Sequence, residues 1–332
     1  MDILNNDFIT YDCIRTSVEI TPEEQVAFAV EKGDMLFQRS SETLEDVGRA
    51  NVYMDDRPAV FGGFVIRGKK KAEYNPMFFR YLLASPYARK KVIPMGAGAQ
   101  HFNIGQDGLS KVKLHFPILQ EQQKIADLLR LINERISTQN KIIEDLKKLK
   151  SAISERLFKS VKGSTVLLSD LCDIVKGKQI NGENLSDSGN YYVMNGGTEP
   201  SGYYDNYNVE ASTISISEGG NSCGYVQFNT SPFWSGGHCY SIQNIADKVD
   251  NMYLYHYLKS NEDAIMKLRI GSGLPNIQKK DLAMFKIIVP KIEWQIKIST
   301  FLSSLERKAE IEERIQNVMQ KQKLYLLQQM FI

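Results

Sequence analysis

Basic and amide side chains are the residues of this sequence most suited to chemistry, because such groups contact phosphates and base edges. Lys and Arg neutralise phosphates, whereas Arg, Asn, Gln, Ser and Thr can read the edges of bases in a groove. A basic cluster is more often a solvated surface, and the same polar residues also make turns, so both interpretations stay open. The candidate DNA-contacting residues are Arg39, Ser41, Thr43, Lys69, Lys70, Arg89, Lys90, Gly98, Gln100, Lys176, Lys178, Asn195, Tyr203, Asn221, Arg269, Ser272, Lys279 and Lys280.

Two glycine loops recur in the sequence, Gly96-Ala97-Gly98 and Gly271-Ser272-Gly273. Neither fits a dinucleotide-binding fingerprint, because the third glycine is absent and a helix is expected where a strand should precede the loop. Each loop is either a turn that needs a positive φ angle or a backbone loop that approaches a phosphate. Nearby Gln100, Arg269 and Lys279 favour the second interpretation, and the choice stays open.

Catalytic chemistry finds little support. Asn75-Pro76-Met77-Phe78 resembles the Asn-Pro-Pro-Tyr/Phe loop of amino-methyltransferases, but Met occupies the third position and no glycine-rich cofactor loop precedes it. A helix N-cap followed by proline explains this segment and its counterpart at Asn251 better. His238-Cys239 has no second ligand pair, so we expect no metal site. We therefore expect a chain without catalytic residues.

Bulk composition sets the limits of the search. The 332 residues have room for about two domains, and the net charge of +2 indicates no strong overall field, so the placement of charge matters more than its sum. Four cysteines without a CxxC pair favour free thiols in a reducing compartment. Without a signal peptide or a long apolar run, the sequence predicts a cytoplasmic protein.

The elements that must position these residues are dominated by a long helix expected from Glu121 to Phe158, which contains no Pro or Gly. Its heptad positions are apolar at eight of ten places, which is the pattern of a coiled-coil seam that needs a partner. Such a helix reaches roughly 57 Å, equivalent to at most about 17 base pairs. The seam positions are Ile125, Leu129, Ile132, Ile136, Gln139, Ile143, Leu146, Lys150, Ile153 and Leu157.

The partner is a second long helix in the same chain, because an internal repeat relates the two halves. A shift of 173 residues places Pro117 on Pro290, Leu129 on Leu302 and Phe158 on Phe331. With small gaps, the match extends back to Asn75 against Asn251. Repeats decide architecture, so this one predicts a globular domain and a long helix, each present twice.

We expect an α+β fold in which the two long helices pack against each other as a coiled coil. The expected parts are a first globular domain at 1–120, a helix at 121–160, a second globular domain at 163–290 and a helix at 291–332. Expected strands of the first domain are 18–20, 35–38, 50–54, 60–67 and 111–119, with a short helix after Thr21-Pro22 and a longer one at 75–91. In the second domain the expected elements include a strand at 213–217, a helix at 251–268 and a strand at 284–290.

The junction Phe116-Pro117-Ile118-Leu119-Gln120-Glu121-Gln122-Gln123-Lys124-Ile125 resembles that of the specificity (S) subunits of type I restriction–modification systems. Gly33-Asp34-Met35-Leu36-Phe37, the helix end Leu157-Phe158 and the segment Gly196-Gly197-Thr198 are also similar to motifs of that family. The second copy of the junction departs from the pattern, with Trp294 where a Glu is expected. The similarity extends over nearly the whole chain.

The resemblance implies a non-catalytic subunit in which two target-recognition domains each bind one half of a bipartite double-stranded DNA site. It also implies that the two long helices form an antiparallel coiled coil, and that modification (methyltransferase) subunits and a restriction subunit assemble on this scaffold. S-adenosylmethionine, ATP and Mg²⁺ would then bind those partner subunits, and this chain would hold no cofactor or metal. A stand-alone methyltransferase or nuclease, and a coiled-coil scaffold without DNA binding, are the alternatives.

One feature departs from the resemblance at the N-terminus. The second domain has an opening strand with Leu168-Ser169-Asp170-Leu171, and no counterpart precedes the first domain. The sequence therefore predicts a first recognition domain that is incomplete at its N-terminal side.

Overall fold

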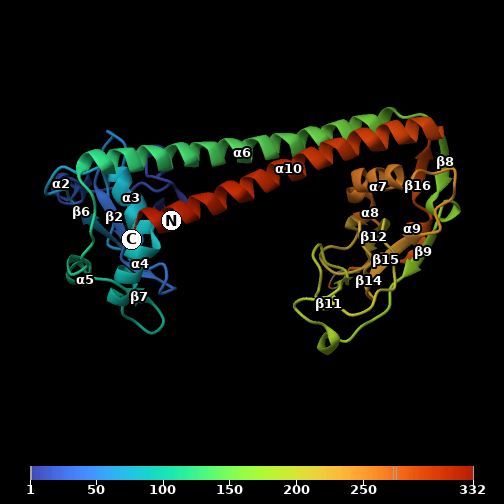
Figure 1. Ribbon diagram of the computed structural model, residues 1–332, viewed down its shortest axis with the longest axis horizontal. Helices are drawn as coiled ribbons and strands as arrows, with labels where there is room; N and C mark the ends of the chain where they lie inside the picture. The colour runs from blue at the N-terminus through green and yellow to red at the C-terminus, as the bar shows by residue number, and fades with distance from the viewer. Residues whose placement is uncertain (1, 272, 274, 332) are drawn as a thin grey trace. The chain divides into compact units, whose positions relative to one another are not determined.

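The computed structural model describes residues 2–271, 273 and 275–331. The chain divides into two compact units, the first made of residues 1–141 and 314–332 and the second of residues 142–313. Each long helix therefore contributes one part to each unit. Helix α6 spans Leu119–Ser160 and helix α10 spans Ile292–Met330, so the long helices expected from the heptad pattern and from the repeat are both present and continuous (Figure 1).

The first unit combines short helices with small antiparallel sheets. The sheet at its centre has the strand order β4-β2-β6, and the pairs β1-β5 and β3-β7 flank it. The helical elements are α1 (Asp2–Asn5), η1 (Tyr11–Cys13), α2 (Pro22–Ala27), α3 (Pro76–Ala84), α4 (Pro86–Val92), η2 (Ile93–Met95) and α5 (Gln106–Ser110). The strands are β1 (Ala29–Val30), β2 (Met35–Gln38), β3 (Ser40–Ser41), β4 (Ala50–Val52), β5 (Ala59–Val60), β6 (Val65–Gly68) and β7 (Phe102–Asn103).

Strand β2 begins after a turn that the sequence encodes locally. Gly33 adopts φ +94°, a left-handed conformation that favours glycine. The buried carboxylate of Asp34 then accepts from the N–H of Glu31 at 2.7 Å and lies 2.6 Å from the guanidinium of Arg67 on β6. The ion pair joins two neighbouring strands, so the Gly-Asp pair fixes both the turn and the sheet.

Several expected elements of the first unit are wrong. The helix expected at 75–91 breaks at Ser85, because a residue before proline is driven to extended backbone, and Ser85 caps α4 instead. Residues 60–67 form two strands separated by Gly62-Gly63, and residues 18–20 form none in the described chain. Residues 111–118 form no strand either, because their backbone bonds side chains: Lys91 donates to the carbonyl of Lys113.

The second unit contains a four-stranded antiparallel sheet with the order β13-β12-β15-β9, next to a smaller sheet with the order β11-β10-β14 (Figure 1). Strand β10 pairs with β14 in parallel, and β16 pairs with β8. The strands are β8 (Ser164–Leu167), β9 (Asp173–Lys176), β10 (Tyr191–Met194), β11 (Tyr203–Tyr204), β12 (Thr213–Ser217), β13 (Val226–Asn229), β14 (Trp234–Ser235), β15 (Cys239–Gln243) and β16 (Lys286–Val289). The helical elements are η3 (Leu168–Asp170), η4 (Gly182–Asn184), α7 (Asn251–Ser260), α8 (Glu262–Met266) and α9 (Lys279–Ala283).

The helices α6 and α10 run antiparallel in each unit. In the second unit Lys147 pairs with Glu313 and Lys150 with Glu306, both at 2.6 Å, so rising numbers on α6 meet falling numbers on α10. In the first unit Gln316 donates to Asn140. The predicted seam positions of α6 are all buried or half-buried, including the polar Gln139 and Lys150. The predicted α+β fold with an antiparallel helix pair is confirmed.

The end of each long helix packs on a short helix that belongs to the other repeat. Phe158 on α6 contacts Tyr253 of α7 with ring centroids 5.7 Å apart. Phe331, directly after α10, contacts Phe78 of α3 at 5.5 Å. Phe158 and Phe331 are equivalent in the repeat, so the two units use the same aromatic contact to close their cores.

The N-cap residues of α3 and α7 show that the sequence alignment of the two repeats is wrong by one residue at this point. Asn75 caps α3, with its side-chain oxygen accepting the N–H of Phe78 at 2.8 Å, and Pro76 follows as predicted. In the second unit the cap is Asp250, which accepts from Tyr253 at 2.7 Å, and the prediction of Asn251 is wrong. A carboxylate and an amide oxygen cap a helix equally well, so residue type alone did not identify the equivalent position.

Candidate nucleic-acid interface

Three adjacent strands of the second unit place polar residues at one end of the sheet. Ser217 pairs with Cys239 and Tyr240 pairs with Lys176, so the end of β12, the start of β15 and the end of β9 lie together. Glu218 follows β12 and His238 precedes β15. The opposite end of the sheet leads to α7, since Asn251 donates to the carbonyl of Ser212 just before β12.

Glu218, Lys176, His238 and Tyr240 form a group that we call the Glu218 cluster. The Glu218 carboxylate is largely buried and lies 2.5 Å from the Lys176 ammonium and 3.5 Å from Nδ1 of His238. The hydroxyl of Tyr240 donates to the carbonyl of Ile277 at 3.0 Å and lies 3.5 Å from Glu218. Burial and the nearby carboxylate raise the pKa of Tyr240 to about 12, so this hydroxyl remains a donor.

Residues 275–277 join the same end of the sheet through backbone hydrogen bonds. The N–H of Ile277 donates to the carbonyl of Glu218 at 2.8 Å, and Gly220 donates to the carbonyl of Pro275 at 3.0 Å. This pairing brings the exposed Lys279 and Lys280 of α9 next to the Glu218 cluster, and exposed Arg269 lies just before the loop. Ser272, also predicted to contact DNA, lies outside the described residues.

Asn195 and Asn221 lie on loops that pack around His238 and Glu218. The side-chain oxygen of Asn195 accepts the backbone N–H of His238 at 3.1 Å. Gly196 adopts φ +86° and lies so close that an added Cβ would be 3.0 Å from Cβ of His238. Asn221 is exposed in the turn after Glu218. Asn195 therefore supports the loop, whereas Asn221 is available to a ligand.

Lys178, in the loop after β9, contacts strand β14 of the smaller sheet, and Tyr203 lies in its strand β11. The carbonyl of Lys178 accepts from the indole N–H of Trp234 at 3.0 Å, and Tyr203 pairs with Tyr192 across β10 and β11. The Lys178 side chain is exposed and Tyr203 is half-buried. These predicted residues extend the same surface away from the Glu218 cluster.

In the first unit, two predicted loops meet through the β3-β7 pair, in which Ser41 lies opposite Phe102. Gly98 adopts φ +143°, and a Cβ there would lie 1.9 Å from the carbonyl oxygen of His101, so this turn requires glycine. Arg39, Thr43 and Gln100 are exposed on these loops, and Ser41 is half-buried.

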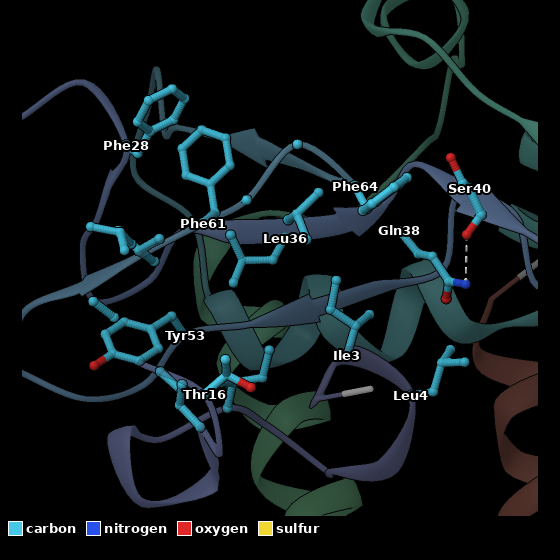
Figure 2. A pocket seen from close by; sticks show the side chains of 18 of the residues that line it. Ile3, Leu4, Thr16, Phe28, Leu36, Gln38, Ser40, Tyr53, Phe61 and Phe64 are labelled. Atoms are coloured by element: carbon cyan, nitrogen blue, oxygen red, sulfur yellow. Dashed lines mark hydrogen bonds between the residues drawn. The ribbon is translucent and has the colours of Figure 1, made fainter. Parts of the chain in front are cut away.

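A hollow of about 1130 Å³ lies beside Ser41 and Thr43. Figure 2 shows that Leu36, Tyr53 and Phe61 line it, with Gln38 and Ser40 at one side, where the amide of Gln38 donates to the carbonyl of Ser40. Its described lining contains no Lys or Arg. Its lining is mainly apolar and includes acidic residues such as Asp46, so the hollow is unlike a surface that would bind phosphate.

Some basic side chains of the first unit are bonded to other protein groups, and others are exposed. Arg89 donates to the carbonyls of Glu45 at 2.7 Å and Val47 at 2.8 Å, and burial lowers the pKa of its guanidinium. Arg89 thus holds the loop before β4. Lys70 pairs with Glu73 at 3.3 Å, whereas the Lys69 and Lys90 side chains are exposed.

The features weighed for catalysis have structural roles. The Asn75 amide caps α3 through its oxygen and donates to Gln123 at 2.7 Å through its nitrogen, so both ends are engaged. Within residues 2–271, 273 and 275–331, no three His, Cys, Asp or Glu residues gather as a metal site. The cysteines are free, and burial raises the pKa of Cys239 to about 11 and that of Cys172 to about 12. In the same ranges, no helix is long and apolar enough to cross a membrane.

The chain thus contains two α+β units of related layout, each with a polar loop surface and a part of each of the two long helices. The family model for the type I restriction modification DNA specificity domain matches residues 1–148 and again residues 162–321. The chain belongs to this family, which confirms the resemblance that the junction and the repeat indicated.

Relatives named as specificity subunits support the assignment. A putative type I restriction enzyme MjaX specificity subunit from Methanocaldococcus jannaschii is 24% identical over 92% of this chain and 79% of its own length. A putative type I specificity subunit from Mycoplasma genitalium is 34% identical, over 36% of this chain and 31% of that protein. One from Mycoplasma pneumoniae is 32% identical, over 43% of this chain and 38% of that protein.

Solved structures show the same fold. The S subunit of a type I restriction–modification system from M. genitalium superposes with a TM-score of 0.64 at 18% identity, covering 92% of this chain and 84% of that one. A chain from a structure that describes complex assembly of the type I system gives a TM-score of 0.60 at 17% identity, with 91% and 82% covered.

Proposed function

We propose that this chain binds a bipartite double-stranded DNA site, one half through each unit, and that modification and restriction subunits assemble on it. The observation that carries the proposal is the equivalent closure of the two units, by Phe158 on Tyr253 and by Phe331 on Phe78. A shared frame with different loops fits two half-sites of different sequence. Antiparallel helices also fit inverted half-sites, as two-fold related DNA readers do.

Exposed apolar side chains on the long helices support the proposed docking of modification subunits. Leu128 on α6 and Phe301 on α10 are separated by the repeat shift of 173 residues, and both are exposed. Large exposed apolar side chains, such as Leu131 and Trp294 on the same helices, mark interaction surfaces when they gather. Equivalent apolar positions on two helices fit two copies of one partner.

The chemistry of the assembled complex is assigned to the partners. We propose that S-adenosylmethionine, ATP and Mg²⁺ bind the modification and restriction subunits, and that this chain supplies recognition without catalysis in the cytoplasm. The Asn75 amide is occupied on both sides by its cap and by Gln123, which argues against its use to grip a flipped base.

Co-expression with a cognate modification subunit, followed by methylome sequencing, tests the proposal. We expect a motif with two specified halves separated by a fixed number of unspecified base pairs. Methylation by this chain alone would support an enzyme instead. Absence of any motif from the complex, together with the absence of salt-dependent DNA binding, would support a scaffold that does not bind DNA.

A further inference from the structure

Glu218 is an acidic residue beside basic ones. Lys176 contacts its carboxylate, and Ile277, two residues before Lys279, donates to its carbonyl, so a phosphate backbone near these lysines would be repelled by the charge of Glu218. Its carboxylate is nevertheless buried and in contact with two basic side chains. An acid in this position needs an explanation other than direct attraction to DNA.

The carboxylate fixes two side chains that are otherwise free to move. The side chains of Lys176 and His238 are 52% and 60% exposed, yet Glu218 holds one at 2.5 Å and the other at 3.5 Å. His238 is fixed a second time at its backbone by Asn195, at 3.1 Å. With Nδ1 directed to Glu218, Nε2 on the opposite edge of the ring is left for a ligand.

We propose that Glu218 is a positioning residue for sequence recognition by the second unit, and this inference rests on the proposed function. Lys176 contacts a phosphate as a point charge, and the imidazole of His238 contacts a base edge in the adjacent groove. Two groups held on one buried carboxylate keep a fixed spacing, and a fixed spacing between phosphate and base contacts sets the register of reading.

Glu218→Gln should change non-specific DNA affinity and half-site discrimination in opposite directions. Removing a negative charge from a DNA-facing surface strengthens binding to any sequence, because fewer repulsive interactions remain. Releasing Lys176 and His238 weakens discrimination at one half-site, because the two contacts lose their register. We therefore expect non-specific affinity to be unchanged or higher, while the preference for the target half-site falls about tenfold, within the range for one mismatched base pair.

The experiment compares methylomes and duplex binding for complexes that carry wild-type chain, Glu218→Gln, His238→Ala or Lys176→Arg. Glu218→Gln and His238→Ala should relax the same half of the motif, and Lys176→Arg, which preserves the ion pair, should retain both halves. Glu306→Gln removes a comparable Lys–Glu pair, between Lys150 of α6 and Glu306 of α10, and is the matched control, expected to leave the motif unchanged.

The outcomes separate this inference from the proposed function. A wild-type complex without a bipartite motif would overturn the proposed function. A wild-type bipartite motif that both Glu218→Gln and His238→Ala leave unchanged would overturn the positioning role alone. His238→Ala replaces an exposed side chain, so it still tests recognition if Glu218→Gln impairs folding.

Discussion

Gln122 and Gln295 make the same pair of hydrogen bonds, each within its own unit. Each donates to the carbonyl of the proline five residues earlier, at 2.8 and 2.9 Å. Each accepts the N–H of the residue that caps the short helix packed on its core, at 2.9 Å in both units. One glutamine per repeat thus joins the start of a long helix to the start of a short one.

Gln295→Ala should destabilise the second unit by roughly 2 to 4 kcal/mol, because it leaves a buried N–H and carbonyls without partners and creates a cavity. Both tryptophans, Trp234 and Trp294, lie in this unit, so urea unfolding followed by tryptophan fluorescence reports on it. Gln122→Ala is the matched control and should leave that transition unchanged. An equal shift of the tryptophan-monitored transition in both variants would contradict the prediction that each glutamine stabilises only its own unit.

Phe331→Ala should release the end of α10 from the first unit, at a cost of roughly 3 kcal/mol for a buried aromatic side chain. Hydrogen exchange of the last turns of α10 measures the loss and should become faster. Tyr325 on the same helix is 61% exposed, so Tyr325→Ala should leave exchange nearly unchanged. Similar exchange in the two variants would show that the Phe331 contact does not hold the helix end.

Lys150→Met should cost about 1 to 2 kcal/mol, because it leaves Glu306 half-buried without its cation. Lys148 pairs with Glu144 at 3.9 Å on the solvent side, and Lys148→Met should change stability by less than about 0.5 kcal/mol. Unfolding in urea gives both values. Equal losses of stability in the two variants would show that the Lys150–Glu306 pair contributes no more than an exposed ion pair.

Stability of the second unit should fall as pH falls below about 6.5. Burial lowers the pKa of His256 from 6.5 to about 4, so the folded state keeps the ring neutral, bonded to Ser303 at 2.9 Å. As the pH falls, the unfolded chain binds a proton at His256 before the folded chain does. The contribution of His256 to the free energy of unfolding, roughly 3 kcal/mol at most, is therefore lost between pH 6.5 and 4. His256→Gln should flatten this part of the profile, whereas His101→Gln in the first unit should not.

Lys279→Ala with Lys280→Ala should weaken binding to all duplexes alike. Loss of two phosphate contacts lowers the slope of log affinity against log salt by about 2. Asn221→Ala should leave that slope unchanged and relax one half-site. Filter binding at several salt concentrations, with target and scrambled duplexes, measures both effects. An unchanged slope in the lysine variant would remove these residues from the interface.

The sequence by itself predicted the features that depend on periodicity. The heptad seam of α6 is a local pattern, and the repeat is found by comparing the sequence with itself at a shift of 173 residues. Both correspond to the long helices and to equivalent core residues such as Leu129 and Leu302. The strand at 213–217 also follows from alternation. Predictions for elements without a clear period were wrong, as for the strand at 111–119, where the carbonyl of Lys113 accepts from the Lys91 side chain.

Only the tertiary structure decided which residues meet across long separations in the chain. Residue type marked Lys176, Arg89 and Asn195 alike as candidates for DNA contact. The fold places Lys176 on Glu218, Arg89 on two loop carbonyls and Asn195 on the backbone of His238. A local pattern carries no information about a partner 42 or more residues away, because that contact depends on how strands and loops pack.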